Sequence, residues 1–452
     1  MSINHTAIVT RIKNVRAFGL DEKGKLKADK LKLGTCYGSQ VVVSLDTTEG
    51  QWGLYFNSDL QLGDEFAKAN DLIRRKDENG NAAGGMFDDK KRVRSQKFRG
   101  EISDGFFIPI QSLSYIGDVD VNTDHVHVKS HVLKEGDQIE SLDGHILCNK
   151  YVTQQTLNYG KSQSSGLKKD GSVDKKFFPE HFDTAQFGRN LNTINENDLI
   201  YILPKKHGTS VRAGITLVNR KLNFIEKFLK KLGIKIQDQE YKFVVGSRRV
   251  IKGLDLKKDE KSFHRKDLWK DAVKSLEPNL HKGEIIYGEI CGYEGVDKPI
   301  MGFYNNKSLG KEFLKKYGNT TVFSYGCNNG EYKFFIYRIA HINQDGIMID
   351  LSYDQVLKRC EQLNVECSKP IWSGYIKDLP MVKETLHENL EFFVESLQEK
   401  SSVIDGTHIE EGFIIQCENY PSPKCLKAKS FSFKVLEGII KDSGVIDMEE
   451  AS

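Results

Sequence analysis

The sequence lacks any long uncharged run of apolar residues, and none of its stretches approaches the length that spans a bilayer. Its first residues, MSINHTAIVTRIKNVRAFG, contain no apolar core of the kind found in secretory signals. We therefore expect a globular protein of the cytoplasm with no membrane partner. At 452 residues, of which 38% are hydrophobic, the chain is long enough for two domains with packed cores.

Compact metal or disulfide motifs are also missing. The eight cysteines are scattered without a single CxxC pair, which indicates reduced thiols. Three histidines, His125, His127 and His131, lie close together in TDHVHVKSH and could offer metal ligands. No cysteine or carboxylate completes an obvious set around them, so a surface strand is the simpler interpretation.

The chain has no glycine-rich phosphate loop of the GxxxxGK[ST] or GxGxxG kind. Any ATP site must therefore use a different chemistry, such as covalent transfer to a lysine. The net charge is only +3, but 66 Lys and Arg residues against 63 acids leave room for local segregation of charge. Composition thus permits nucleic-acid binding without requiring it.

Short apolar alternations dominate the chain from Ala7 to about Gly117, including SQVVVSL and QWGLYF. This pattern predicts a small all-β unit within residues 1–150, most simply a five-stranded barrel of the OB type. In the segment KKRVRSQKFRG, alternation puts Arg92 and Arg94 on one strand face, where they could bind nucleic acid. A solvated edge strand explains the same pattern equally well.

The run YGKSQSSGLKKDGSVDKK is nearly free of apolar residues and predicts a surface loop or linker within residues 151–195. Beyond it, residues 196–452 mix strands with helical periodicities, which predicts an α+β domain. Leu222, Ile225, Leu229 and Leu232 show one such periodicity. The charged tract 252–270 is expected to form an exposed loop that leads into a helix.

In ILPKKHGTSVR, an apolar strand runs into Lys205, Lys206, His207 and Gly208, so a lysine is presented at a strand end. To act as a nucleophile this amine must lose its proton, and lowering a lysine pKa to near 7.5 takes about 4 kcal/mol. Cations can supply that bias. Lys427 and Lys429 alternate along KCLKAKSFSFK and so point to one side, toward a phosphate group if that side faces the site.

Other segments offer further groups that a nucleotide site needs. Arg248 ends an apolar strand where its guanidinium could contact ribose or phosphate oxygens, and Glu289 could accept a hydrogen bond from a ribose hydroxyl. The strand EYKFFIYRIA carries aromatic side chains on which a purine could stack. Glu411 follows in IEEGFIIQC as a candidate ligand for Mg²⁺ or Mn²⁺. Singly, each of these segments is more simply structural.

In this order the segments resemble the motifs of the covalent nucleotidyltransferase superfamily, from the KxHG loop to the KxK strand. The resemblance implies that residues 196–452 form an adenylyltransferase domain and that Lys205 accepts AMP from ATP. The remaining implied roles concern nucleotide and metal. The resemblance implies that Lys427 and Lys429 bind the phosphates, that Arg248 and Glu289 bind the ribose, and that Glu411 binds the metal. It also implies that adenine lies between Ile414 and either Phe334 or Phe335, and that His207 and Gly208 contact the nucleotide.

The residues after the nucleophile resemble RNA ligases more than DNA ligases, because His207 stands where DNA ligases commonly have an aspartate. A β-rich unit before this domain is similar to the Deinococcus-type RNA ligases, which seal nicks with an RNA 3′-hydroxyl end. Two positions differ from the common pattern: Pro204 replaces a frequent acid, and Arg338 replaces an aspartate after the aromatic strand. The stretches of the Lys-rich loop and of residues 343–400 look like insertions.

The resemblance implies three steps: AMP moves from ATP to Lys205, then to an RNA 5′-phosphate, and is expelled when the 3′-hydroxyl attacks. A divalent metal would be required, and RNA repair would be the natural setting. The partner implied is duplex RNA with 3′-hydroxyl and 5′-phosphate ends. The alternatives are a DNA ligase, a GTP-dependent capping enzyme or an inactive relative that only binds RNA.

Overall fold

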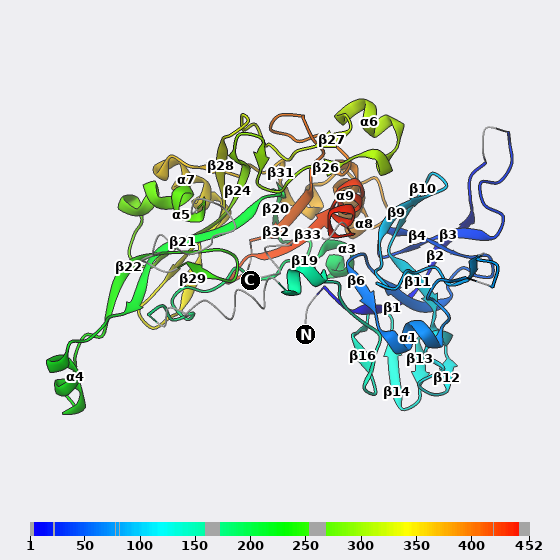
Figure 1. The fold of residues 1–452 in the computed structure, drawn as a ribbon, viewed down its shortest axis with the longest axis horizontal. Coiled ribbons are helices and arrows are strands. Elements are labelled where there is room, and N and C mark those ends of the chain that lie inside the picture. Colours follow the sequence, from blue (N-terminus) through cyan, green and yellow to red (C-terminus); the bar gives the residue numbers. More distant parts are fainter. Residues whose placement is uncertain are drawn as a thin grey trace.

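The computed structural model describes residues 4–442 except 21–22, 77, 81, 159–171, 253–267 and 419. It has the α+β composition expected, built from antiparallel sheets with helices on their faces (Figure 1). Most of the predicted Lys-rich loop and of the charged tract 252–270 lies outside the described residues. No helix in the described part of the chain is long and apolar enough to cross a membrane.

The N-terminal region is all-β apart from short helical turns. Its central sheet has the order β11-β5-β1-β15, formed by Phe106–Pro109, Trp52–Phe56, Ala7–Arg11 and Gln138–Ile139. A second sheet joins β2 (Lys13–Ala17), β3 (Leu31–Cys36) and β4 (Ser39–Ser44). Smaller pairs and a triplet complete the region. They are β6 (Leu60–Leu62) with β18 (Cys148–Lys150), β9 (Ser95–Phe98) with β10 (Glu101–Asp104), and β12 (Val119–Val121), β13 (His125–Val128) and β14 (His131–Lys134).

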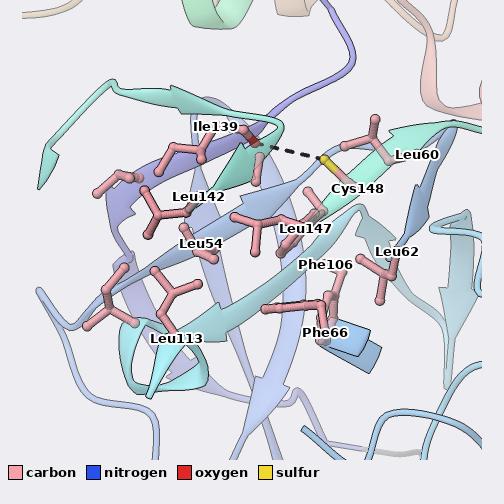
Figure 2. Packing of buried hydrophobic residues seen from close by; sticks show 14 of the residues in the cluster. Leu54, Leu60, Leu62, Phe66, Phe106, Leu113, Ile139, Leu142, Leu147 and Cys148 are labelled. Atoms are coloured by element: carbon pink, nitrogen blue, oxygen red, sulfur yellow. Dashed lines mark hydrogen bonds between the residues drawn. The ribbon is translucent and has the colours of Figure 1, made fainter. Parts of the chain in front are cut away.

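One hydrophobic cluster joins the central sheet to the β6-β18 pair and to the β12-β13-β14 triplet (Figure 2), while the β2-β3-β4 sheet packs through two smaller clusters. Helix α1 (Asp64–Ala69) contributes Phe66, which packs on Phe56 of the central sheet with ring centroids 5.4 Å apart. Figure 2 shows Leu54, Leu60 and Cys148 converging on the same core from three strands, together with Leu147 from the residue before β18. The alternation read from the sequence therefore does mark strands with one buried face.

The expected closed OB-like barrel is not found among the described residues. The central sheet ends at β11 on one side and at β15 on the other, and neither edge pairs with the β2-β3-β4 sheet. The central sheet and the β2-β3-β4 sheet are therefore separate. The sequence pattern could identify strands but could not tell a closed ring from several small sheets, because pairing partners are not encoded in alternation alone.

The C-terminal half contains two larger sheets. One has the order β19-β33-β32-β20-β31, and the other runs β23-β22-β21-β24-β28-β29, with β25 (Lys298–Pro299) and β30 (Glu366–Cys367) at its side. The first comprises Ala185–Gln186, Lys424–Lys429, Gly412–Cys417, Leu199–Pro204 and Trp372–Tyr375. The second comprises Ile251–Lys252, Gln239–Gly246, Thr209–Asn219, Glu284–Gly295, Tyr332–Ile342 and Met348–Asp350.

Helices cover these sheets. Helices α5 (Leu268–Val273) and α7 (Tyr353–Leu363) supply apolar side chains to the core of the larger sheet, and α8 (Leu386–Leu397) supplies them to the core of the smaller one. Since β31 pairs with β20 and both α7 and α8 are packed, residues 343–400 contribute to the cores of both sheets. The remaining helices are α3 (Phe187–Asn190), α4 (Phe224–Lys231), α6 (Lys311–Tyr317) and α9 (Phe431–Asp442).

Helix α9 joins the two halves of the molecule. Arg92 of the N-terminal region donates a hydrogen bond to the Gly438 carbonyl at 2.8 Å and forms an ion pair with Asp442 at 2.9 Å. Its side chain is only 2% exposed and stacks over the Tyr151 ring. Lys441 reaches back to Asp59 at 3.1 Å. The junction is thus a buried ionic contact between distant parts of the sequence.

Candidate active site

The segment from Lys205 to Gly208 connects the two large sheets, because β20 of one sheet ends at Pro204 and β21 of the other begins at Thr209. The Lys205 amide donates to the Gly412 carbonyl at 2.8 Å, which holds the start of this loop against β32. A Cβ atom on Gly208 would lie 2.2 Å from the Ile290 carbonyl oxygen. Glycine is therefore required there, where the loop runs against β24.

Glu411 is the centre of a buried network of charges. Its Oε1 atom lies 2.8 Å from Nζ of Lys205 and 3.7 Å from Nζ of Lys429. Lys429 also pairs with Glu437 of α9 at 2.9 Å. Burial raises the pKa of Glu411, and the neighbouring ammonium groups oppose that shift. Two lysines from different segments therefore meet at one carboxylate.

The protonation of the lysines differs from our expectation. Burial works against the charge on Lys205, but the Glu411 carboxylate outweighs it and the pKa of Lys205 is raised. The lowered pKa belongs instead to Lys427. Burial, together with Lys429, Lys205 and Arg248, brings the pKa of Lys427 to about 7. In the nucleotide-free protein the amine of Lys205 is thus charged and paired.

Lys205 opens onto a cavity of about 130 Å³ between the two sheets. Glu289 of β24 faces this cavity and accepts a hydrogen bond from the Ser210 hydroxyl at 3.0 Å. Arg248 also lines it and pairs with Asp183 at 2.6 Å. The predicted ribose-contacting residues therefore line the same cavity as the candidate nucleophile. Lys427 and Lys429 line a second, larger cavity of about 390 Å³ that extends toward the N-terminal region.

The aromatic wall of the 130 Å³ cavity is not the one we predicted. Phe334 and Phe335 lie in two hydrophobic cores, and neither lines the cavity. Tyr337 does line it, together with Ile414. Strand β28 has an irregular register at this point, since Tyr287 pairs with Arg338 and Gly288 with Ile336, which leaves Tyr337 as the extra residue. A bulge of this kind turns two successive side chains to the same side, and the sequence pattern does not reveal it.

Arg338, the second residue at the bulge, also lines the cavity. Its guanidinium lies over the rings of Phe182 and Tyr287 and pairs with Asp350 at 2.6 Å. His181 and Phe182 contribute to the same wall, although they come from the segment that we predicted to be a linker. The only signal for them was the cluster of aromatic residues in FFPEHFD.

His207 and Lys206 are both buried beside the nucleophile. The His207 ring packs against Phe323 and Phe433 with centroids 4.9 and 4.7 Å apart, and its Nε2 atom contacts the Tyr304 hydroxyl at 2.5 Å. Burial lowers the pKa of His207 well below its ordinary value, so the ring is neutral. His207 therefore anchors the loop through its packing on Phe323 and Phe433 and does not line the 130 Å³ cavity. Lys206 is buried, and its ammonium lies over the Tyr325 ring.

Glu411 has the properties of a metal-holding side chain. Its second oxygen, Oε2, is buried, lies 3.8 Å from Nδ1 of His207 and has no hydrogen-bond partner within the described part of the chain. An unsatisfied buried carboxylate oxygen is costly unless a cation accompanies it, so the residue fits a divalent ion.

The three histidines noted in the sequence do not share one contact: His125 contacts His127 at 3.0 Å, whereas His131 pairs with Asp143. Among the described residues no group of three or more His, Cys, Asp or Glu side chains forms a ready-made metal site.

The two arginines expected to contact nucleic acid are tied to α9. Arg92 is buried in the ionic junction, so it is not an exposed binding residue as we expected. Arg94 is partly exposed and pairs with Asp88 at 2.6 Å and with Asp442 at 3.0 Å. Both residues precede β9, and the alternation that suggested a binding face instead places them against the C-terminal helix.

Comparison with known proteins identifies related structures. A family model described as RNA ligase matches residues 199–436, more than half of the chain. Curated proteins give no significant match. Among solved structures, an RNA ligase mutant from Naegleria gruberi without ligand aligns with a TM-score of 0.55 and 14% identity over 96% of this chain and 98% of its own.

Two further structures of the same Naegleria gruberi ligase contain ligands. A mutant with ATP and Mn gives a TM-score of 0.54 at 13% identity, covering 95% of this chain and 98% of that one. Another mutant, with AMP and Mn, gives a TM-score of 0.53 at 12% identity and covers the same shares. The likeness extends over nearly the whole length of both proteins, including the N-terminal region, and establishes that the fold is shared.

Proposed function

Because this chain belongs to the RNA ligase family, we propose that it is an ATP-dependent RNA ligase that joins 3′-hydroxyl and 5′-phosphate ends through a lysyl-AMP and an RNA-adenylate. The observation that carries the proposal is the position of Lys205, whose amine meets Glu411 at 2.8 Å at the edge of the 130 Å³ cavity. This arrangement presents the Lys205 amine to a nucleotide bound between the sheets. The Naegleria gruberi ligase, which shares the fold, has been captured with ATP and Mn.

In the proposed first step, the lone pair of Lys205 Nζ attacks the α-phosphorus of ATP, and the bond to pyrophosphate breaks. Before this attack the Lys205 ammonium must give a proton to water, and its pairing with Glu411 opposes that loss. Any cation that binds the Glu411 carboxylate in place of Lys205 makes this proton easier to lose. Adenylyl transfer then needs little acid–base chemistry, because pyrophosphate leaves without protonation and positioning supplies most of the catalysis.

The remaining residues hold the nucleotide in this proposal. Adenine lies between Tyr337 of β28 and Ile414 of β32, which belong to different sheets and both line the cavity. Glu289 and Arg248 take the ribose, and their position in the wall of the cavity that Lys205 also lines supports that role. Lys427 and Lys429 take the phosphates. Their alternation along β33 directs both side chains to the cavity that continues toward the N-terminal region.

Glu411 is the residue that would hold a divalent ion, Mg²⁺ or Mn²⁺, whose chemistry is to neutralise charge on the phosphates. Its buried and unpartnered Oε2 atom supports this assignment. Gly208 and His207 act on the loop rather than on the nucleotide. They hold the backbone of Lys205 at the junction through close packing on β24 and on the Phe323 and Phe433 rings.

We further propose that residues 1–150 and 196–452 act as two domains, with the first contributing to RNA binding, and that RNA repair is the setting. The resemblance to the Deinococcus-type enzymes, which also carry a β-rich unit before the catalytic domain, supports a nick in a duplex as the substrate. A DNA nick, or GTP as the nucleotide, is the alternative that an assay must separate from this.

The test is sealing of matched nicked duplexes. One carries an RNA 3′-hydroxyl strand, the other a DNA 3′-hydroxyl strand, and both carry a 5′-phosphate. We expect sealing of the RNA nick with ATP and Mg²⁺ or Mn²⁺, none with GTP, and none by Lys205→Ala. Sealing of the DNA nick alone, or activity only with GTP, contradicts the RNA ligase proposal. Binding of RNA without adenylylation or sealing identifies an inactive relative.

A further inference from the structure

Helix α4 stands apart from the rest of the molecule. It caps the long hairpin of β21 and β22 and projects beyond the body of the protein (Figure 1). The helix is well formed, with a capping box in which Asn223 and Glu226 satisfy each other's backbone amides. None of its residues is buried. A helix that is ordered locally but packs on nothing has a free face.

That free face is apolar. Phe224, Phe228 and Leu232 follow one another at intervals of four residues and so form a stripe along one side, which Ile225 widens. Phe224 is 86% exposed and Ile225 66%, and the other two are more than half exposed. From the sequence this periodicity predicts a helix that turns its apolar side to a core. The structure shows that no core covers it among the described residues.

The polar side of the segment faces its own hairpin. Glu226 pairs with Arg220 at 2.8 Å, and Asp238 pairs with Lys230 at 2.6 Å. These are the two carboxylates between residues 220 and 238, and both are neutralised locally. The cations left over are exposed and make no ion pair within the described chain. They are Lys221, Lys227, Lys231 and Lys235.

The outward surface of α4 therefore combines large apolar side chains with positive charge and carries no free carboxylate. A second copy of the same surface is a poor partner, since the lysines would repel each other. RNA fits this surface less well, because bases could stack only on Phe224 and Phe228 and would leave the aliphatic side chains of Ile225 and Leu232 in water. An anionic bilayer satisfies both features: the apolar stripe enters the headgroup boundary and the lysines reach the charged lipids.

We propose that α4 is a membrane-contact element that binds the surface of anionic lipid bilayers. An apolar stripe or a basic patch alone gives weak, reversible binding, and the two together give a stable attachment. The hairpin holds α4 away from the body, so the helix can lie flat on a bilayer without a clash (Figure 1). This proposal revises the expectation that the protein has no membrane partner, and it is independent of the ligase activity.

The test is flotation of the full-length protein with vesicles of phosphatidylcholine alone and with vesicles that also contain phosphatidylserine. We expect flotation only with the anionic vesicles, lost at high salt. The double variant Phe224→Ser/Phe228→Ser should bind at least about tenfold more weakly, because it removes the apolar stripe. Lys227→Glu/Lys231→Glu should also lose binding, through the charge alone.

Matched control variants distinguish binding through α4 from non-specific hydrophobic or electrostatic binding by other parts of the surface. Val296→Ser removes a similarly exposed apolar side chain elsewhere, and Lys311→Glu/Lys315→Glu reverses two lysines of α6. Both controls should float like the wild type, and every α4 variant should seal nicks normally. Failure of the wild type to float, or equal flotation of the α4 variants, overturns the proposal. Loss of RNA affinity in those variants without any flotation would assign α4 to RNA instead.

Discussion

Glu411 decides the protonation of the candidate nucleophile. Its carboxylate keeps Lys205 charged in the nucleotide-free protein, whereas the neighbouring cations act mainly on Lys427. The sequence could identify both lysines, because they lie in recognisable motifs. It could not assign their pKa values, since these depend on which carboxylate lies nearest in space. The acid–base state of the site is thus a property of the fold.

Tyr337 offers a direct test of the nucleotide cavity. We expect Tyr337→Ala to raise the Kd for ATP about 5- to 150-fold, because loss of a stacking partner costs about 1–3 kcal/mol. Titration calorimetry in a Lys205→Ala background measures binding without transfer. As a control, Phe335→Leu should lower the Tm through loss of core packing and leave the Kd unchanged. An unchanged Kd for Tyr337→Ala would show that adenine lies elsewhere.

Lys427 should make ATP binding pH-dependent. Because its pKa is lowered to about 7, the ammonium form is present below that pH and is lost above it. If this charge holds phosphate, the affinity for ATP weakens as the pH rises through about 7. Lys427→Arg stays charged throughout and should flatten the profile. The Kd measured across this range for both proteins checks the prediction, and identical profiles contradict it.

At the scale of elements, the loop between β20 and β21 depends on glycine. Gly208→Ala would bring a Cβ atom within 2.2 Å of the Ile290 carbonyl and push the loop off β24. A shift of about 1 Å at a reacting group can slow a reaction about a hundredfold, so we expect a loss of that order in adenylylation rate. Gly295→Ala, whose Cβ has its nearest neighbour at 4.0 Å, is the matched control and should be neutral. Single-turnover labelling measures both rates.

Elements differed in how far the sequence predicted them. The apolar run before Lys205 and the alternation around Lys427 both gave strands where expected. The bulge in β28 and the N-terminal sheet arrangement were not predictable. A bulge shifts the side-chain register without a change in composition, and a barrel requires knowledge of which strands pair. Local patterns thus predicted the strands but not the cavity wall that one of them forms.

The whole molecule is joined through α9, and this junction was invisible in the sequence. Arg92 and its partner Asp442 are 350 residues apart in the sequence. We expect Arg92→Met to lower the free energy of unfolding by about 2–3 kcal/mol, because it leaves Asp442 and Asp59 without their buried partner. Arg94→Met, at a partly exposed pair, should cost about 1 kcal/mol or less. Guanidinium unfolding curves compare the two, and equal effects would contradict a special role for Arg92.

The central claim is covalent transfer of AMP to Lys205. It is tested most directly by incubating the protein with ATP labelled in its α-phosphate and a divalent ion, followed by denaturing electrophoresis and peptide mapping. We predict a labelled protein whose adduct maps to Lys205, which disappears in Lys205→Ala and persists in Lys206→Ala. A label on another residue, or a label that survives Lys205→Ala, would contradict the account.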